Sequence, residues 1–157
     1  MHESPVPICP YCLEPAVFEA SSAGIYGADY GPRWVCASCG ASVGVHKGTR
    51  RPLGRLADRT LRVWKRRAHL AFDPLWLQAR DAYPEIHGSI RHITRIARTR
   101  AYLWLADQMR LSVDECHIGT FDVEHCREVI AIVQRENPTA ATIRAWAKAR
   151  TLPGDPP

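Results

Sequence analysis

The sequence predicts an α+β fold that is mostly helical, with a small cysteine-containing β segment followed by a bundle of about five helices. Residues 1–45 are rich in Gly, Pro and Cys and contain only short apolar runs, which is typical of turns and short strands. From Pro52 onward, apolar residues recur every three to five positions, as they do on one buried face of a helix. The chain has 157 residues, 46% hydrophobic and 24% charged. This composition suits one or two small globular domains and excludes a disordered chain, a coiled-coil rod and a collagen repeat.

Residues 1–48 are expected to form the first domain. The strand candidates are residues 16–18, 34–35 and 42–45, where β-branched and aromatic residues gather between turn residues. The Gly and Asp residues between positions 24 and 32 predict a hairpin loop.

Residues 49–150 are expected to form a helical domain packed on the first. A first helix from about Leu53 would bury one face, made of Leu53, Leu56, Leu61, Trp64, Ala68 and Phe72. Asp73-Pro74 predicts the start of a short second helix, because an N-cap acid followed by Pro suits the first turn.

The remaining helices are also predicted from their start signals. Ser89 opens a third helix that runs to about Met109. Asp122 is the expected N-cap of the fourth, and Thr139 that of the last. The tail, residues 151–157, is expected to be loose.

Two C-x₂-C pairs dominate the first domain. Cys9 and Cys12 form one pair, and Cys36 and Cys39, followed by Gly40, form the other. A two-residue spacer lets both thiolates of a pair reach one ion, and tetrahedral Zn²⁺ takes four such ligands. The pattern predicts a zinc ribbon with one structural Zn²⁺, because four cysteines leave no open coordination position. A structural disulfide and a dithiol redox pair are the alternative interpretations; the first does not suit a reducing compartment, and the second does not explain a matching second pair.

The chain is expected to act in the cytoplasm and to have no membrane partner. It contains no run of about 18 apolar residues that could span a bilayer. Its first residues lack the basic and apolar stretches of a secretory signal.

The net charge of +5 is concentrated in one segment. Residues 41–70 contain nine basic residues and a single acid, Asp58, whereas residues 1–40 contain one basic residue and four acids. Such a cluster is the usual electrostatic signal for phosphate binding, although a solvated helix face looks similar. The predicted phosphate-facing surface comprises Lys47, Thr49, Arg50, Arg51, Arg55, Arg59, Arg62 and Arg66.

A second group of chemically interesting residues lies near Cys116 and His117. With His125 and Cys126 it could be imagined as another metal site, or as a reactive Cys-His pair. The spacing suits neither, so we expect these cysteines to pack in the core.

Several of these motifs together resemble one known family. They are the two cysteine pairs, the run Val43-Gly-Val-His-Lys-Gly-Thr49, Pro52-Leu-Gly54, the run from Ala68 to Trp76, Ala101-Tyr-x-Trp-Leu-Ala106, and Cys116-His-Ile-Gly119 with Phe121. The sequence is similar to zinc-finger-containing domains of bacteriophages and prophages, a family with no established activity. The resemblance implies a zinc site at Cys9, Cys12, Cys36 and Cys39, and a phage-encoded protein in the host cytoplasm.

Two functions fit these features. The first is non-enzymatic binding of DNA or RNA, with Trp34, Tyr26 and Tyr30 able to stack on bases if they are exposed. The alternative is a phage effector that binds a host protein, inhibiting or redirecting a nucleic-acid-handling enzyme or a defence complex; an exposed cluster of Trp or Tyr would favour it. No enzymatic activity is expected, because the one local cluster of acids and histidines, between Asp107 and Asp122, matches no hydrolase motif.

Overall fold

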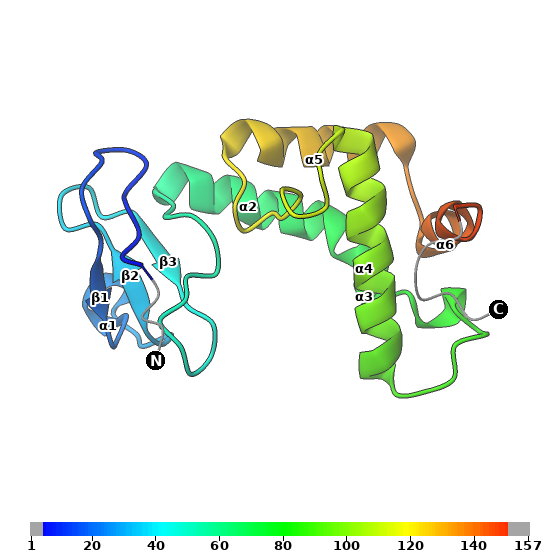
Figure 1. Ribbon diagram of the computed structural model, residues 1–157, viewed down its shortest axis with the longest axis horizontal. Coiled ribbons are helices and arrows are strands. Elements are labelled where there is room, and N and C mark those ends of the chain that lie inside the picture. The colour runs from blue at the N-terminus through cyan, green and yellow to red at the C-terminus, as the bar shows by residue number, and fades with distance from the viewer. Residues whose placement is uncertain (1–4, 151–157) are drawn as a thin grey trace. The chain divides into compact units, whose positions relative to one another are not determined.

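The computed structural model describes residues 5–150 (Figure 1). The predicted loose tail, residues 151–157, lies outside the described residues. Contacts divide the chain into two compact units, Met1–Val63 and Trp64–Pro157, called the first and the second unit below. A small antiparallel sheet near the N-terminus is followed by five α-helices, so the predicted α+β, mostly helical fold is confirmed.

The first unit is built around a three-stranded antiparallel sheet in the order β1-β2-β3. The strands are β1 (Val17–Glu19), β2 (Arg33–Val35) and β3 (Ser42–Gly44). Trp34 pairs with Phe18 on one side and with Val43 on the other, so these three side chains share a face of the sheet. Trp34 and Val43 are buried together with Cys9, Cys36 and Leu56, which forms a small core next to the cysteines.

The predicted hairpin loop between β1 and β2 contains a short helix, α1 (Ala23–Tyr26). It ends at Gly27, whose φ of 70° lies in the left-handed region that glycine adopts without a steric cost. A four-residue helix without an apolar stripe leaves no periodic pattern in the sequence, so the turn residues predicted the loop but not the helix within it.

The first unit extends past the predicted domain end at residue 48. Val45 forms a bridge with Pro52, and Ser42 forms one with Ala57, so the chain returns along β3 before any helix begins. Helix α2 (Arg59–Phe72) therefore starts six residues after Leu53, and the predicted start is wrong. Asp58 caps it, since its carboxylate accepts a hydrogen bond from the Leu61 N–H at 2.7 Å.

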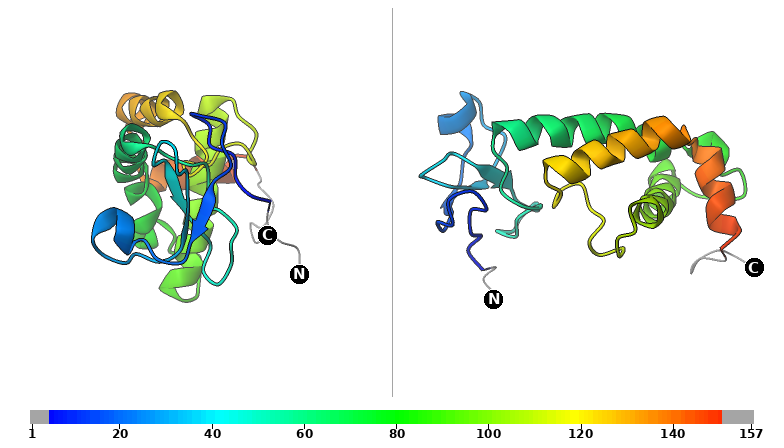
Figure 2. Two further views of the ribbon diagram at one scale, coloured as in Figure 1. Left: turned by 90° about the vertical axis from the view of Figure 1, so that its left-hand side faces the viewer. Right: turned by 90° about the horizontal axis from the view of Figure 1, so that it is seen from above.

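The second unit contains the rest of α2 and four further α-helices. They are α3 (Pro74–Leu77), α4 (Ile90–Met109), α5 (Val123–Glu136) and α6 (Ala140–Lys148), with a 3₁₀ turn, η1 (Arg80–Ala82), after α3. Helix α4 contacts α3, η1, α5 and α6. Figures 1 and 2 show the second-unit part of α2 running beside α5, and the Arg127 guanidinium lies 4.7 Å from the centre of the Trp64 ring.

The predicted N-caps of the last three helices are confirmed. The Ser89 hydroxyl accepts a hydrogen bond from the His92 N–H, and Asp122 accepts one from the His125 N–H. Thr139 and Thr142 form a reciprocal capping box at the start of α6. Each cap satisfies N–H groups that the first helical turn leaves without a partner.

The buried face predicted for the first helix agrees with the structure at Leu56, Leu61, Ala68 and Phe72. Leu53 is 49% exposed because it precedes α2, and Ile90 is 59% exposed in the first turn of α4. On α5, Ile132 is buried beside Cys126 and Val129, whereas Ile130 and Val133 are half-buried. Within the described residues, no helix is both long and apolar enough to cross a membrane.

Candidate metal centre

Each cysteine pair lies on a tight turn that points both thiols to the same place. In the first turn, the Leu13 N–H donates to the Cys9 carbonyl. In the second, the Gly40 N–H donates to the Cys36 carbonyl, and Gly40 has a φ of 72°. This left-handed conformation explains why glycine follows the second pair. The sheet brings the two turns together, because β2 leads directly into the second one.

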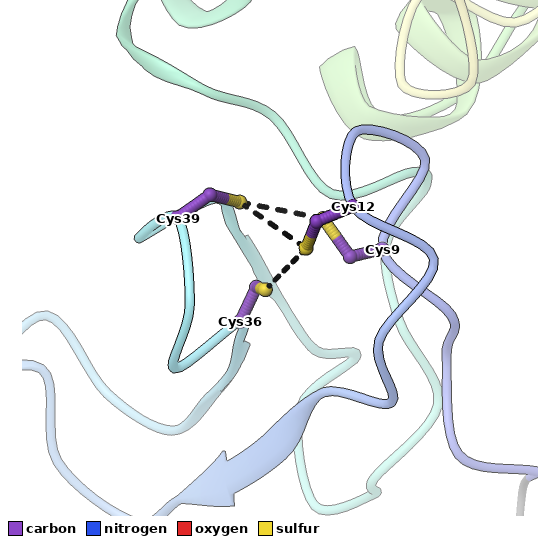
Figure 3. A group of neighbouring side chains, drawn as sticks. All are labelled: Cys9, Cys12, Cys36 and Cys39. Atoms are coloured by element: carbon purple, nitrogen blue, oxygen red, sulfur yellow. Dashed lines mark hydrogen bonds between the residues drawn. The ribbon is translucent and has the colours of Figure 1, made fainter.

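The four sulfur atoms converge on one point (Figure 3). All four lie within 4.8 Å of one another. The Cys9–Cys39, Cys12–Cys36 and Cys12–Cys39 sulfur pairs are 3.4, 3.2 and 3.9 Å apart. Four thiolates placed about 2.3 Å from a tetrahedral zinc ion would have sulfur–sulfur distances of about 3.8 Å. The cluster therefore has the size and the ligand set of a closed Cys₄ zinc site.

The Cys12 and Cys36 thiols differ in their affinity for protons. Hydrogen bonds from the Cys39 backbone N–H and the Cys12 thiol lower the pKa of Cys36 to about 6. At Cys12 the Glu14 backbone N–H lowers the pKa, but hydrogen bonding to Cys36 and burial outweigh it and raise the pKa to about 12. Because zinc binds thiolates, the metal must displace the protons that remain on the cluster.

The profile of a family described as zinc-finger-containing domain matches residues 5–136. The chain belongs to this family. No curated protein and no solved structure matches it significantly. The Cys₄ cluster lies inside the matched range, so this zinc-finger domain carries the ligands for one structural zinc ion. Helix α6 lies beyond the matched range.

The predicted basic surface begins at the turn after β3. Lys47, Arg50 and Arg51 have exposed side chains there. The Thr49 hydroxyl donates to the His46 carbonyl and accepts from the Arg51 N–H, so it holds the turn together. The Arg50 guanidinium lies 4.6 Å from the centre of the Phe18 ring.

The four arginines expected on one helical stripe are separated by the structure. Arg55 precedes α2, and its side chain is half-buried. Arg62 donates to the Ser42 hydroxyl at 3.2 Å and to the Ala57 carbonyl at 3.1 Å, which holds α2 against β3 within the zinc-finger unit. Arg59 and Arg66 remain exposed, seven residues apart on α2, as expected for one helix face.

The aromatic residues named in the sequence have different surroundings. Trp34 is 5% exposed, and its indole N–H donates to the Arg50 carbonyl at 2.7 Å, so it is part of the core. Tyr26 and Tyr30 are exposed and contact each other, with ring centres 5.9 Å apart. Arg33 lies over the Tyr26 ring, and sequence analysis missed it because nothing in the sequence links residues 26 and 33.

The second group of cysteines is buried in the helical unit. Cys116 is 2% exposed and Cys126 is fully buried, and this burial raises the pKa of both thiols to about 11. The His117 ring stacks on Tyr102, and its Nδ1 accepts a hydrogen bond from the Gly119 N–H. These surroundings suit the packing role predicted for this segment.

Proposed function

We propose that this zinc-finger domain protein binds nucleic acid without catalysing a reaction. The binding surface is the basic part of the first unit, formed by the turn after β3 and the first turn of α2. Its exposed members are Lys47, Arg50, Arg51 and Arg59. In keeping with the resemblance to phage proteins, the proposed place of action is the cytoplasm of a bacterial host.

The observation that carries this proposal is the excess of positive charge in residues 41–70, which contain nine basic residues and one acid. Asp58 is the only acid in residues 41–70, and its carboxylate is used as the N-cap of α2. Within residues 5–150, neither Lys47 nor Arg59 forms an ion pair. Phosphate groups would supply the missing counter-charge, and their contacts give affinity with little sequence specificity.

The zinc ion supports this surface indirectly. The second cysteine turn leads into β3, and β3 ends three residues before Lys47. The His46 N–H donates to the Arg51 carbonyl, so the basic turn is closed by its own backbone. A basic loop held at one place loses less conformational entropy on binding than a free loop.

The test is fluorescence anisotropy with labelled DNA and RNA of mixed sequence. For the native protein, the logarithm of the association constant should fall linearly with the logarithm of salt concentration between about 50 and 200 mM. The double variant Lys47→Glu/Arg59→Glu should bind at least about tenfold more weakly and show a flatter salt dependence. The matched control Arg135→Glu/Arg150→Glu makes the same change in net charge in the second unit, on residues that are ion-paired to Glu136 and Asp107.

Binding that is equally weak in both double variants would contradict the proposed surface. Zinc content and far-ultraviolet circular dichroism of each variant establish that the fold is intact. Arg62 is left unchanged, because its replacement would remove the contacts to Ser42 and Ala57.

Exposed apolar residues favour protein binding as a second candidate function. Ile8, Leu13 and Val17 are 57, 77 and 54% exposed in the first unit, beside the first cysteine turn. In this alternative the protein is a phage effector that docks on a host protein handling nucleic acid. Co-purification from a host lysate, with and without nuclease, separates the two functions: a partner that survives nuclease and is lost in Leu13→Asp supports protein binding.

A further inference from the structure

Tyr30 is the most exposed aromatic side chain of the first unit, with 75% of its surface open to solvent. Its backbone is nevertheless well anchored. The Tyr30 N–H donates to the Ser22 hydroxyl at 2.5 Å, and Ser22 is fully buried. The carboxylate of Asp29 accepts hydrogen bonds from the N–H groups of Ser22 and Gly31 at 3.1 and 2.9 Å. An aromatic ring is thus presented to solvent from a loop of defined shape.

Tyr26 supports this ring from the side. The two ring planes meet at 75° in an edge-to-face contact, which leaves the exposed surface of Tyr30 uncovered by Tyr26. The guanidinium groups of Arg33 and Arg62 lie 4.5 and 5.9 Å from the centre of the Tyr26 ring. Burial alone would raise the pKa of Tyr26, but hydrogen bonding to Ser42 and the two nearby arginines lower it.

The two arginines are held together at one place. Both donate to the Ser42 hydroxyl, Arg33 at 3.5 Å and Arg62 at 3.2 Å. A guanidinium carries five N–H donors, and these contacts use only some of them. Two like charges side by side repel each other, so a shared anion would stabilise the pair.

We propose that Tyr30 stacks on an unpaired base and that Arg33 and Arg62 bind the neighbouring phosphate, so that the ligand of the first unit is single-stranded nucleic acid. This inference rests on the proposed function and names its ligand class. Tyr26 acts as a positioning residue for the Tyr30 ring and for the guanidinium groups. Single-stranded DNA and single-stranded RNA offer the same two groups.

At the cluster of Tyr26, Tyr30, Arg33 and Arg62, base stacking contributes more than charge to the preference for single strands over duplexes. Two acids lie near it: Glu19 is opposite Arg33 in the β1–β2 register, and Asp29 is bound to backbone N–H groups. The local charge is therefore weaker than at the Lys47–Arg59 surface. In a duplex the base faces are already stacked on one another, so an exposed tyrosine can reach them only in a single strand.

The experiment compares four labelled probes of about 12 nucleotides by anisotropy: oligothymidylate, oligouridylate, an abasic strand with the same number of phosphates, and a duplex. The native protein should bind the first two more tightly than the others. Tyr30→Ala should weaken binding of oligothymidylate or oligouridylate about tenfold and leave binding of the abasic strand unchanged. Tyr30→Phe is the matched control, since it keeps the ring and should keep the affinity.

Other outcomes separate this inference from the proposed function. If Tyr30→Ala binds every probe as the native protein does, the inference is wrong, while the proposed function stands provided that Lys47→Glu/Arg59→Glu still weakens binding. If the native protein binds none of the probes at low salt, both are wrong. A difference between the first two probes tells whether DNA or RNA is preferred. Zinc content of the Tyr30 variants shows that the loop change leaves the metal site intact.

Discussion

At the scale of single residues, the six cysteines fall into two classes with different surroundings. Cys9, Cys12, Cys36 and Cys39 converge at metal-binding distances, whereas Cys116 and Cys126 are buried in the helical unit. The core beside the metal site is small, with Trp34, Val43 and Leu56 as its largest members. So small a core supplies little folding free energy, and metal binding must supply much of the rest.

Replacing Cys36 tests the metal site. Cys36→Ala should abolish stoichiometric zinc binding and unfold the first unit, because three thiolates leave an open and weaker site. Zinc content by mass spectrometry under native conditions measures the first effect, and hydrogen exchange of residues 5–58 measures the second. Retention of one tightly bound zinc ion in Cys36→Ala would contradict the assignment.

Cys126→Ala is the matched change in the other class of cysteine. Cys126 is fully buried in α5, like Cys36 in its own unit. The replacement should keep one zinc ion per chain but lower the free energy of unfolding by about 1 kcal/mol or more, through lost packing. Denaturant unfolding followed by circular dichroism measures the change. Loss of zinc together with stability would show that Cys126 has a metal-binding role.

At the scale of elements, helices α4, α5 and α6 of the second unit each begin where a side chain accepts a hydrogen bond from an N–H group of the first turn. The capping box at the start of α6 is the clearest case. The Thr139 hydroxyl accepts from the Thr142 N–H at 3.1 Å, and the Thr142 hydroxyl accepts from the Thr139 N–H at 2.8 Å. Helix α6 then contacts α4 and η1, and its buried residues are Ile143 and Ala147.

Thr139→Ala should lower the free energy of unfolding by about 1 kcal/mol, because it leaves an N–H of the first turn without its partner. Thr139→Ser keeps the hydroxyl and should change stability by only a few tenths of a kcal/mol. Thermal unfolding of the two variants measures the difference. Equal melting temperatures of Thr139→Ala and Thr139→Ser would show that the capping box does not stabilise the second unit.

An ion pair joins Glu85, in the turn between η1 and α4, to Arg144 of α6, which is distant in sequence. Glu85 accepts two hydrogen bonds from the Arg144 guanidinium, each at 2.7 Å, and Lys148 lies 3.5 Å away. The hydrogen bonds from Arg144 lower the pKa of Glu85 from 4.5 to about 2. Since the pKa is lower in the folded protein, the stabilisation is fully present above pH 4.5 and is lost as the pH falls toward 2.

Glu85→Gln should therefore destabilise the protein by about 1 kcal/mol at neutral pH and by progressively less in acid. Melting temperatures measured from pH 7 down through the acid range test this. The exposed Glu128 makes no ion pair within the described residues. The melting temperature of Glu128→Gln should therefore equal that of the native protein at every pH. If the melting temperature of Glu85→Gln changed with pH in parallel with that of the native protein, the ion pair would not be the cause of the loss of stability in acid.

At the scale of the whole molecule, the two units have different sources of stability. The first depends on zinc and a small core, whereas the second buries apolar residues from α3 to α6, among them Leu105, Ile118, Val129, Ile132 and Ile143. A strong chelator should therefore unfold residues 5–58 while most of the helical signal persists. Circular dichroism with hydrogen exchange resolved by peptide measures both. Simultaneous loss of all helices on chelation would mean that the units do not unfold separately.

Much of the metal site and of the helix boundaries could be predicted from the sequence. The C-x₂-C pairs, the caps at Asp122 and Thr139 and the Pro after Asp73 act over a few neighbouring residues, and local geometry is enough to interpret them. The mostly helical class followed from apolar periodicity, which one buried face imposes on any helix. These features are determined by the sequence alone because the two cysteines of each pair, and each cap and the N–H that it binds, are close along the chain.

Features that depend on distant partners were decided only by the tertiary structure. The pairing of Ala57 with Ser42 delays α2 to Arg59, and the same strand takes Arg62 out of the predicted basic stripe. Tyr26, Arg33 and Arg62 come from three different segments and meet only because the sheet and α2 place them together. Nothing local distinguishes an arginine that faces solvent from one that braces a strand. That choice depends on which acceptors the fold brings within hydrogen-bond distance, and here Ser42 and Ala57 decided it.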